Sequence, residues 1–154
     1  MYFLIFDIQD VYTTAISTIE LIRVQYNTLQ RDFSFPVQFD FLDQGSIVSI
    51  EVSTASNSKN LSEDTAAESY KLAYTNMNAP FHSHLESLSH LLVALDAVET
   101  GGIKKLQDQR RLLIQQLDNE ARFLETCVCT VWEGWVLGKR SQGIERNLED
   151  MSMV

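Results

Sequence analysis

Hydrophobic residues over residues 79–126 follow the repeat of an amphipathic helix, with one interruption. In the first part their spacing alternates between four and three positions, which places them on one face because each helical residue turns by about 100°. These residues are Phe81, Leu85, Leu88, Leu92 and Leu95. Thr100, Gly101 and Gly102 then interrupt the repeat, and glycine suits the left-handed backbone at a helix end. The pattern predicts a helix over residues 79–99.

The apolar repeat resumes after the glycines and continues as far as Trp135. Its positions are Leu106, Leu113, Leu117, Leu124, Val128, Val131 and Trp135. This second pattern predicts a helix over residues 103–135. Because the connection between the two helices is so short, we expect them to lie antiparallel.

A third amphipathic segment lies between residues 10 and 32, where Asp7 or Asp10 is suited to cap the helix start. Its apolar stripe consists of Tyr12, Ala15, Ile16, Ile19, Ile22, Tyr26 and Leu29. Two helices alone would leave half of their leucines exposed to water, so a third helix is needed to cover them. The sequence therefore predicts an all-α fold, an antiparallel three-helix bundle over residues 10–135.

The segment between the first two predicted helices changes character along its length. Residues 35–41 are aromatic and include Pro36, which prevents further helix. We expect them to form a hydrophobic strap over the end of the bundle, and the alternative is an edge that docks a peptide. Residues 43–68 are rich in polar side chains and predict a long flexible loop, with a short strand at 47–52 that lacks an evident partner. Residues 136–154 are expected to form a flexible tail.

The charged residues of the helical hairpin form a pattern that core packing does not require. Glu86, Ser89, Val93 and Asp96 make a second stripe beside the leucines. The two acids would stand roughly 15 Å apart along the helix, at about 1.5 Å rise per residue. The next helix begins with cations, which oppose the positive end of its dipole. They are Lys104, Lys105, Arg110 and Arg111. A solvated face and a contact surface for an acidic partner both fit this pattern.

The segments LLVALDAVE and QRRLLIQQLDNEARFLE, joined by the short turn, resemble the BAG domain. The resemblance covers residues 79–126 and, more loosely, residues 10–41. Members of this family are cochaperones that bind the nucleotide-binding domain of seventy-kilodalton heat-shock chaperones (the heat-shock protein 70 class) and promote the release of ADP. The resemblance implies the same three-helix fold and the same partner for this chain.

The resemblance also implies which residues contact the chaperone. Glu86 and Asp96 match a family glutamate and aspartate ten positions apart, and Arg110 matches an arginine early in the third helix, with Arg111 beside it. Asp118 stands where well-known animal members have glutamine. A carboxylate accepts hydrogen bonds but cannot donate one as an amide does, so this fourth contact departs from the family pattern.

Composition narrows the function classes. A chain of 154 residues with 45% hydrophobic and 21% charged residues indicates one globular domain. Its net charge of −9 argues against nucleic-acid binding. Glycine-rich phosphate loops, serine elbows and supported cysteine–histidine pairs are missing from the sequence, so we expect no enzyme. His82, Glu86 and His90 share one side of a helix, and we expect a solvated polar face there, with no metal and no other cofactor.

Cysteine usage and hydropathy bear on the compartment. Cys127 and Cys129 point about 200° apart on a helix and cannot pair with each other there. Nothing suggests a disulfide framework, which fits a reducing compartment. The opening MYFLIF is too short for a signal core, and no segment approaches the about 18 apolar residues of a membrane span. We expect a soluble, cytoplasmic monomer.

The sequence thus gives two hypotheses of function. The first is a BAG-type cochaperone that acts as a nucleotide exchange factor. The alternative is a helical adaptor that binds another protein without exchange activity.

Overall fold

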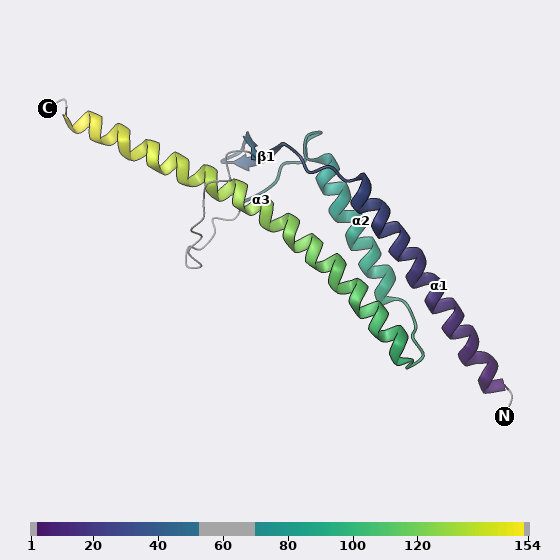
Figure 1. The fold of residues 1–154 in the computed structure, drawn as a ribbon. Coiled ribbons are helices and arrows are strands. Elements are labelled where there is room, and N and C mark those ends of the chain that lie inside the picture. Colours follow the sequence, from purple (N-terminus) through teal and green to yellow (C-terminus); the bar gives the residue numbers. More distant parts are fainter. Residues whose placement is uncertain (1–2, 53–69, 153–154) are drawn as a thin grey trace. The chain divides into compact units, whose positions relative to one another are not determined.

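The computed structural model describes residues 3–52 and 70–152, with side chains described for residues 8–52 and 70–143. Within these residues the chain forms helices and one pair of strands (Figure 1). The elements are α1 (Phe3–Asp32), β1 (Gln38–Asp43), β2 (Ser46–Glu51), α2 (Ala79–Asp96) and α3 (Lys104–Ser152). The protein is mostly helical, but β1 and β2 form an antiparallel sheet, so the prediction of a purely all-α fold is wrong.

The chain divides into two compact units. Unit 1 consists of Met1–Ser34 and Phe81–Phe123, and unit 2 of Phe35–Pro80 and Leu124–Val154. The long helix α3 contributes its first part to unit 1 and the remainder to unit 2.

In unit 1, α1 and α2 run in opposite directions. A Cβ built on Gly101, just beyond α2, would lie 3.1 Å from Cγ1 of Val11 near the start of α1. At the other end, the ring of Phe33 stacks on His84 of α2 with ring centroids 4.0 Å apart. Gly101 has a φ of 54°, a left-handed conformation that glycine adopts without strain. Helix α2 ends earlier than the predicted residue 99, at Asp96, and the glycines lie in the turn between Thr100 and Ile103, where Gly101 leaves room for α1.

Helix α3 runs in the same direction as α1. The hydroxyl of Tyr26 donates a hydrogen bond to the carbonyl oxygen of Gln116 at 3.4 Å. One turn further along both helices, Nε2 of Gln30 donates to Glu120 at 2.7 Å. The buried side chains of unit 1 come from all three helices. They are Ala15, Ile19, Ile22 and Tyr26 of α1, Phe81, His84, Leu88, Leu91 and Leu95 of α2, and Leu106, Leu113 and Leu117 of α3.

The buried face of α2 differs slightly from the predicted stripe. Leu88 is fully buried as expected, but Leu85 and Leu92 are only half-buried. His84 and Leu91, each one position earlier in the chain, take the buried positions instead. The helix is therefore rotated by part of a turn relative to the prediction, and a polar side chain enters the interior.

Strands β1 and β2 form a hairpin in unit 2. Gln44 and Gly45 connect them with φ values of 49° and 83°, and two consecutive positive φ values are typical of the tight turns that match the twist of a hairpin. Phe39 lies opposite Ile50 in the register. The aromatic stretch expected as a strap is thus strand β1, and it is the partner that the short strand predicted at 47–52 lacked.

Aromatic rings form the centre of unit 2. Phe41 is fully buried, and its ring centroid lies 5.1 Å from that of Trp132 on α3. Trp132 in turn lies 5.0 Å from Trp135. Nζ of Lys139 lies 4.1 Å above the Trp135 ring and pairs with Asp43 at 2.9 Å, so α3 holds the hairpin by apolar and ionic contacts.

A buried polar cluster fixes the other face of the hairpin. The carboxylate of Asp40 accepts hydrogen bonds from Ser49 at 2.6 Å and Thr75 at 2.7 Å, and these bonds lower its pKa. The amide of Asn78, which is fully buried, donates to the carbonyl oxygens of Asp40 and Ala73. The buried polar side chains of Asp40 and Asn78 therefore have partners, as stable interiors require.

Element boundaries differ from the prediction at both ends. Helix α1 begins at Phe3 rather than near residue 10, and α3 continues to Ser152, through the segment expected as a tail. Of the loop expected at 43–68, Ser46–Glu51 is strand β2, and residues 53–68 lie outside the described part of the chain.

Candidate protein-binding surface and a buried polar network

The acidic stripe predicted on α2 is exposed to solvent. Glu86, Ser89 and Asp96 are all exposed, and Val93 between them is 66% exposed. Among the described residues, neither Glu86 nor Asp96 has a hydrogen-bond or ion-pair partner. The stripe thus presents two unpaired carboxylates with an apolar side chain between them.

This stripe lies on a different side of α2 from α1. Ala94 and Val98 line a groove together with residues of α1, which defines the α1 side. At about 100° per residue, Glu86, Val93 and Asp96 lie roughly 80°, 100° and 160° around the helix from Ala94, and none of them lines the groove. The acids therefore face away from α1.

Arg110 takes part in the fold of unit 1. Its guanidinium Nη1 donates a hydrogen bond to the carbonyl oxygen of Val98 at 2.8 Å, and the side chain is partly buried. Val98 lies just beyond the end of α2, where carbonyl groups lack partners within the helix. Arg110 consequently stabilises the connection between α2 and α3, and it lies at the same end of α2 as Asp96.

The other two predicted contact residues are paired on the surface of α3. Arg111 pairs with Asp108 at 3.2 Å, and both side chains are at least 40% exposed. Asp118 pairs with Arg122, one turn along the helix, at 2.9 Å. Asp118 stands about 12 Å along α3 from Arg110, at about 1.5 Å rise per residue. The structure thus brings Asp96 and Arg110 to one end of the hairpin and leaves Asp118 further along it.

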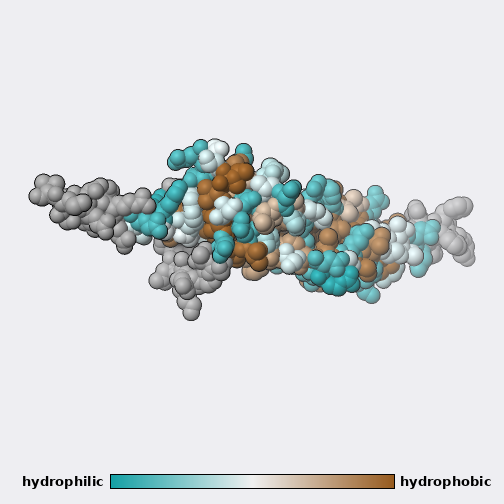
Figure 2. Space-filling view, turned by 90° about the horizontal axis from the view of Figure 1, so that it is seen from above, coloured by the Kyte–Doolittle hydropathy of each residue, from teal (hydrophilic) through white to brown (hydrophobic). Residues whose placement is uncertain are grey.

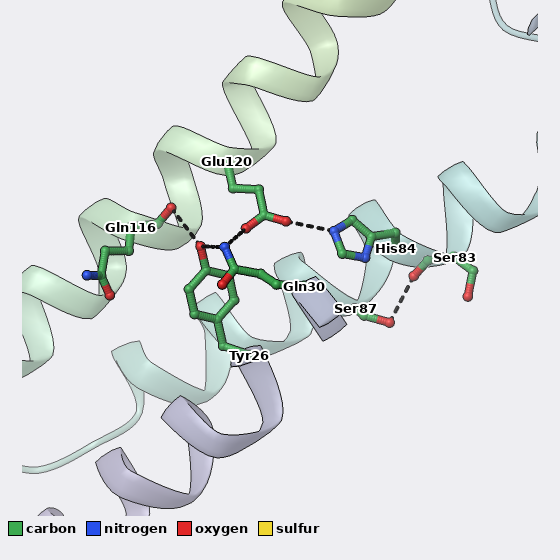
Figure 3. A network of polar contacts seen from close by, with 7 residues as sticks. All are labelled: Tyr26, Gln30, Ser83, His84, Ser87, Gln116 and Glu120. Atoms are coloured by element: carbon green, nitrogen blue, oxygen red, sulfur yellow. Dashed lines mark hydrogen bonds and ion pairs between the residues drawn. The ribbon is translucent and has the colours of Figure 1, made fainter. Parts of the chain in front are cut away.

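A buried polar network in unit 1 was missed by the sequence reasoning (Figure 3). Its centre is Glu120 of α3, whose Oε1 lies 2.8 Å from Nε2 of His84 on α2. Its other oxygen accepts a hydrogen bond from Gln30 of α1, whose amide nitrogen also lies 2.8 Å from the hydroxyl of Tyr26. One carboxylate therefore joins α1, α2 and α3.

The network changes the acidity of its members. Burial alone would raise the pKa of Glu120, but hydrogen bonds from Tyr26, His84 and Gln30 outweigh burial and the pKa is lowered. Burial raises the pKa of Tyr26, and the Glu120 carboxylate raises it further. Glu120 is therefore held as a carboxylate. These features are typical of a structural cluster, because the side chains of His84 and Glu120 are only 4% and 15% exposed.

One sequence signal pointed to this network. His84, Tyr26 and Gln30 occupy positions on or next to the apolar stripes, where an uncharged polar side chain needs a buried partner. The partner, Glu120, is one of several acids on α3, and only the packing of the helices distinguishes it from them.

The metal candidate from the sequence has no support in its geometry. His82 is half-buried, whereas Glu86 and His90 are exposed, and no group of three or more histidine, cysteine or acidic residues in the described chain is arranged to hold a metal ion. Cys127 and Cys129 are both free and half-buried, and burial raises their pKa values.

Hydrophobic side chains reach the surface of unit 2 as well. Val37, Ile47 and Tyr74 are 80%, 57% and 88% exposed. Figure 2 shows hydrophobic residues, coloured brown, exposed among the hydrophilic residues of one face. None of the helices in the described part of the chain is both long enough and apolar enough to cross a membrane.

Comparison with known proteins finds no matching family, no similar curated protein and no similar solved structure.

Proposed function

We propose that this protein is a BAG-type cochaperone that binds the nucleotide-binding domain of a seventy-kilodalton heat-shock chaperone and promotes ADP release. The observation that carries the proposal is the exposed stripe of α2. Its two acids have the ten-residue separation of the family, and neither is paired with a described residue. An acid that contributes nothing to its own fold is available to a partner.

The proposed function also depends on how the three helices of unit 1 are arranged. We infer that α1, α2 and the first part of α3 form an antiparallel three-helix bundle of the BAG type. The opposite directions of α1 and α2 and the link that Glu120 makes among the three helices support this arrangement. In such a bundle α1 backs the hairpin, and the α2–α3 face meets the chaperone.

The mechanism is a population shift and involves no chemistry on this chain. Glu86 and Asp96 would meet basic groups of the chaperone, and Arg110 would meet a carboxylate across its nucleotide cleft. A surface that fits the open cleft better than the closed, ADP-holding cleft moves the equilibrium toward opening. By linkage, the protein must weaken ADP binding by the same factor by which ADP weakens binding of the protein.

The decisive experiment measures ADP release from a purified chaperone nucleotide-binding domain, with and without this protein. The wild type should accelerate release. Asp96→Ala and Glu86→Ala should reduce the acceleration, because each removes an interface charge without touching the core. Glu125→Ala, which removes an exposed acid of unit 2, is the matched control and should behave as wild type. A wild-type protein that never changes the release rate would refute the proposed function.

The hydrogen bond of Arg110 favours a second candidate, an adaptor that binds a protein without exchanging nucleotide. Because the guanidinium already bonds to the carbonyl of Val98, contact with a chaperone would have to share or replace that bond. Asp118→Gln separates the candidates further. It restores the family amide and removes the ion pair between Asp118 and Arg122, so an exchange factor should bind its chaperone more tightly with this substitution, and an adaptor for another partner should be indifferent.

A further inference from the structure

A groove separates α1 and α2 along the first half of α1. Its volume is about 450 Å³. Small side chains line the groove. They are Thr14, Ala15 and Thr18 of α1, Ala94 of α2, and Ala97 just beyond the end of α2. Ala15 is only 3% exposed and forms part of the groove floor, whereas Ala94 and Ala97 are exposed at its wall. No large side chain of the described residues fills this space.

Two carboxylates stand at one end of the groove. Asp10 and Glu99 both line it, and they lie at the same end because the start of α1 meets the end of α2 at Val11 and Gly101. Both acids are exposed, and neither has a hydrogen-bond or ion-pair partner in the described chain. The chain also carries a net charge of −9, which favours a cationic partner, although Arg110 bonds to the carbonyl oxygen of Val98 beside Glu99.

The shape of the groove fits a helix. Small residues on two neighbouring helices allow a third backbone to approach closely. Leu21 is 59% exposed and lies on the same side of α1 as Thr14 and Thr18, seven and three positions away, so apolar surface continues beyond the groove. An amphipathic helix laid along this line would place an apolar side chain in the groove and another beside Leu21.

We propose that the α1–α2 groove is a second binding site, which takes a basic amphipathic helix of a partner protein. The apolar face of that helix fills the groove, and lysine or arginine side chains at one end meet Asp10 and Glu99. A second copy of this chain does not supply the helix. Its own cluster of cations lies at the start of α3, where Leu106 and Leu113 are already fully buried within unit 1.

This site is separate from the proposed chaperone surface. Glu86, Val93 and Asp96 do not line the groove, and Arg110 approaches it only through its hydrogen bond to the carbonyl oxygen of Val98. One molecule could therefore hold a chaperone and a basic helix at the same time, which would make it a bridge between them.

The test uses a fluorescent peptide of about 18 residues, roughly five helical turns. It carries leucines at spacings of three and four and lysines on the flanking positions. A second peptide replaces every lysine with glutamate. Fluorescence anisotropy with the full chain at low salt should show binding of the lysine peptide and none of the glutamate peptide.

Two substitutions on the protein locate the peptide. Glu99→Lys should weaken the lysine peptide by about threefold to tenfold, because it turns an attraction into a repulsion at a partly exposed site. Ala94→Phe should weaken it by filling the groove with a ring. Glu125→Lys changes the net charge equally at a distance from the groove and should bind as wild type, and circular dichroism checks that each variant is folded.

Clear outcomes would overturn the proposal. Equal binding of both peptides, or unchanged binding to folded Glu99→Lys and Ala94→Phe, would remove the groove as the site. If the wild type alone is a dimer that Ala94→Phe dissociates, the occupant is a second copy instead. ADP release distinguishes this site from the chaperone surface, because Glu99→Lys should leave release unchanged even where it abolishes peptide binding.

Discussion

At the scale of single residues, Glu120 of α3 is the side chain that links the other two helices of unit 1 by hydrogen bonds. Its carboxylate receives hydrogen bonds from Gln30 and His84, which belong to different helices. A buried donor without an acceptor costs about 1–3 kcal/mol, so loss of this side chain affects several groups at once. The network replaces apolar contact with a directional link, and the geometry of the link fixes how the helices are rotated against each other.

Substitution of Glu120 tests this role. Glu120→Ala should lower the free energy of unfolding by about 1–3 kcal/mol, because buried His84 loses its acceptor, whereas exposed Gln30 can bond to water. The neighbouring Asn119 is exposed, and Asn119→Ala should change stability by less than about 0.5 kcal/mol. Chemical denaturation followed by circular dichroism measures both. Equal stability of the two variants would show that the network contributes nothing to the fold.

The lowered pKa of Glu120 adds a pH dependence with a definite sign. A carboxyl group whose pKa is lower in the folded state stabilises the fold above its ordinary value of 4.5, and this contribution disappears as the pH falls through the folded-state value. The wild type should therefore lose more stability than Glu120→Gln between about pH 6 and about pH 3. Parallel pH profiles would contradict the assignment, since Asp40 titrates in the same direction in both proteins.

Trp132 offers an opposite case, a polar atom that the fold leaves unused. The side chain is 6% exposed, and its indole Nε1 has no hydrogen-bond partner among the described residues. Trp132→Phe keeps an aromatic ring against Phe41 and removes the buried donor, so stability should stay within about 1 kcal/mol of the wild type. Trp132→Ala should cost about 3–5 kcal/mol. Thermal unfolding measures both, and a phenylalanine variant as unstable as the alanine variant would reveal a partner for the indole.

At the scale of elements, the position of α2 about its own axis decides which leucines stabilise the fold. Leu88 is fully buried and Leu92 is half-buried. Leu88→Ala should cost about 2–5 kcal/mol through the cavity it leaves. Leu92→Ala should cost clearly less, because less apolar area is returned to water. Urea denaturation of the two variants checks the order, and a larger loss for Leu92→Ala would mean that α2 is rotated toward the predicted stripe.

This rotation shows what the sequence could and could not predict. The apolar period identified the existence and the start of α2 correctly, and the positive φ values of Gly101 and Gly102 occur in the connection after it, because periodicity and left-handed glycines are local properties. The helix itself ends at Asp96, before the predicted residue 99. It favoured Leu85 and Leu92 as core residues because both are apolar. The structure buries His84 instead, since Glu120, a residue 36 positions later, provides a hydrogen-bond partner. A local pattern contains no information about such a partner.

The β-hairpin was missed for a different reason. Its strands are short, six residues each, and the second alternates only weakly between apolar and polar positions. The first strand has buried Phe39, Asp40 and Phe41 in succession, and buried Asp40 breaks the alternation that a strand normally shows. Ser49 and Thr75 donate hydrogen bonds to the carboxylate of Asp40, and Asn78, far along the chain, bonds to its backbone, and these partners make the burial tolerable. The turn at Gln44 and Gly45 is the local signal for a hairpin, but the polar composition around it favours a loop.

At the scale of the whole molecule, α3 connects the two units as one continuous helix. Leu113 and Leu117 belong to unit 1, and Val128 and Trp132 to unit 2. The predicted contact residues of the chaperone surface all lie in unit 1. Substitutions in the aromatic core of unit 2 therefore test stability, and substitutions on the α2–α3 face test function.

Arg110 has a role in the stability of unit 1 and a proposed role in chaperone binding, so its substitution is the sharpest test of the functional proposal. Arg110→Ala removes the hydrogen bond to the carbonyl of Val98, so the free energy of unfolding should fall by about 0.5–1.5 kcal/mol. If the guanidinium also meets a carboxylate of the chaperone in a desolvated interface, binding should weaken by about 2–5 kcal/mol. That loss corresponds to roughly thirtyfold to several-thousandfold in affinity. Arg111→Ala is the control for stability alone, because its exposed pair with Asp108 should matter little to the fold while Arg111 is itself a predicted contact residue.

The two readouts have to be taken on the same protein, because a destabilised variant also binds less. Unfolding in urea gives the folded fraction, and ADP release is then compared at equal concentrations of folded protein. A binding loss much larger than the stability loss places Arg110 in the interface, and rising salt should weaken the wild-type complex through its exposed charges. A folded Arg110→Ala protein that accelerates release at the wild-type rate would leave Arg110 with only its bond to Val98. The chaperone contact would then have to rest on Glu86 and Asp96, whose alanine variants test it independently.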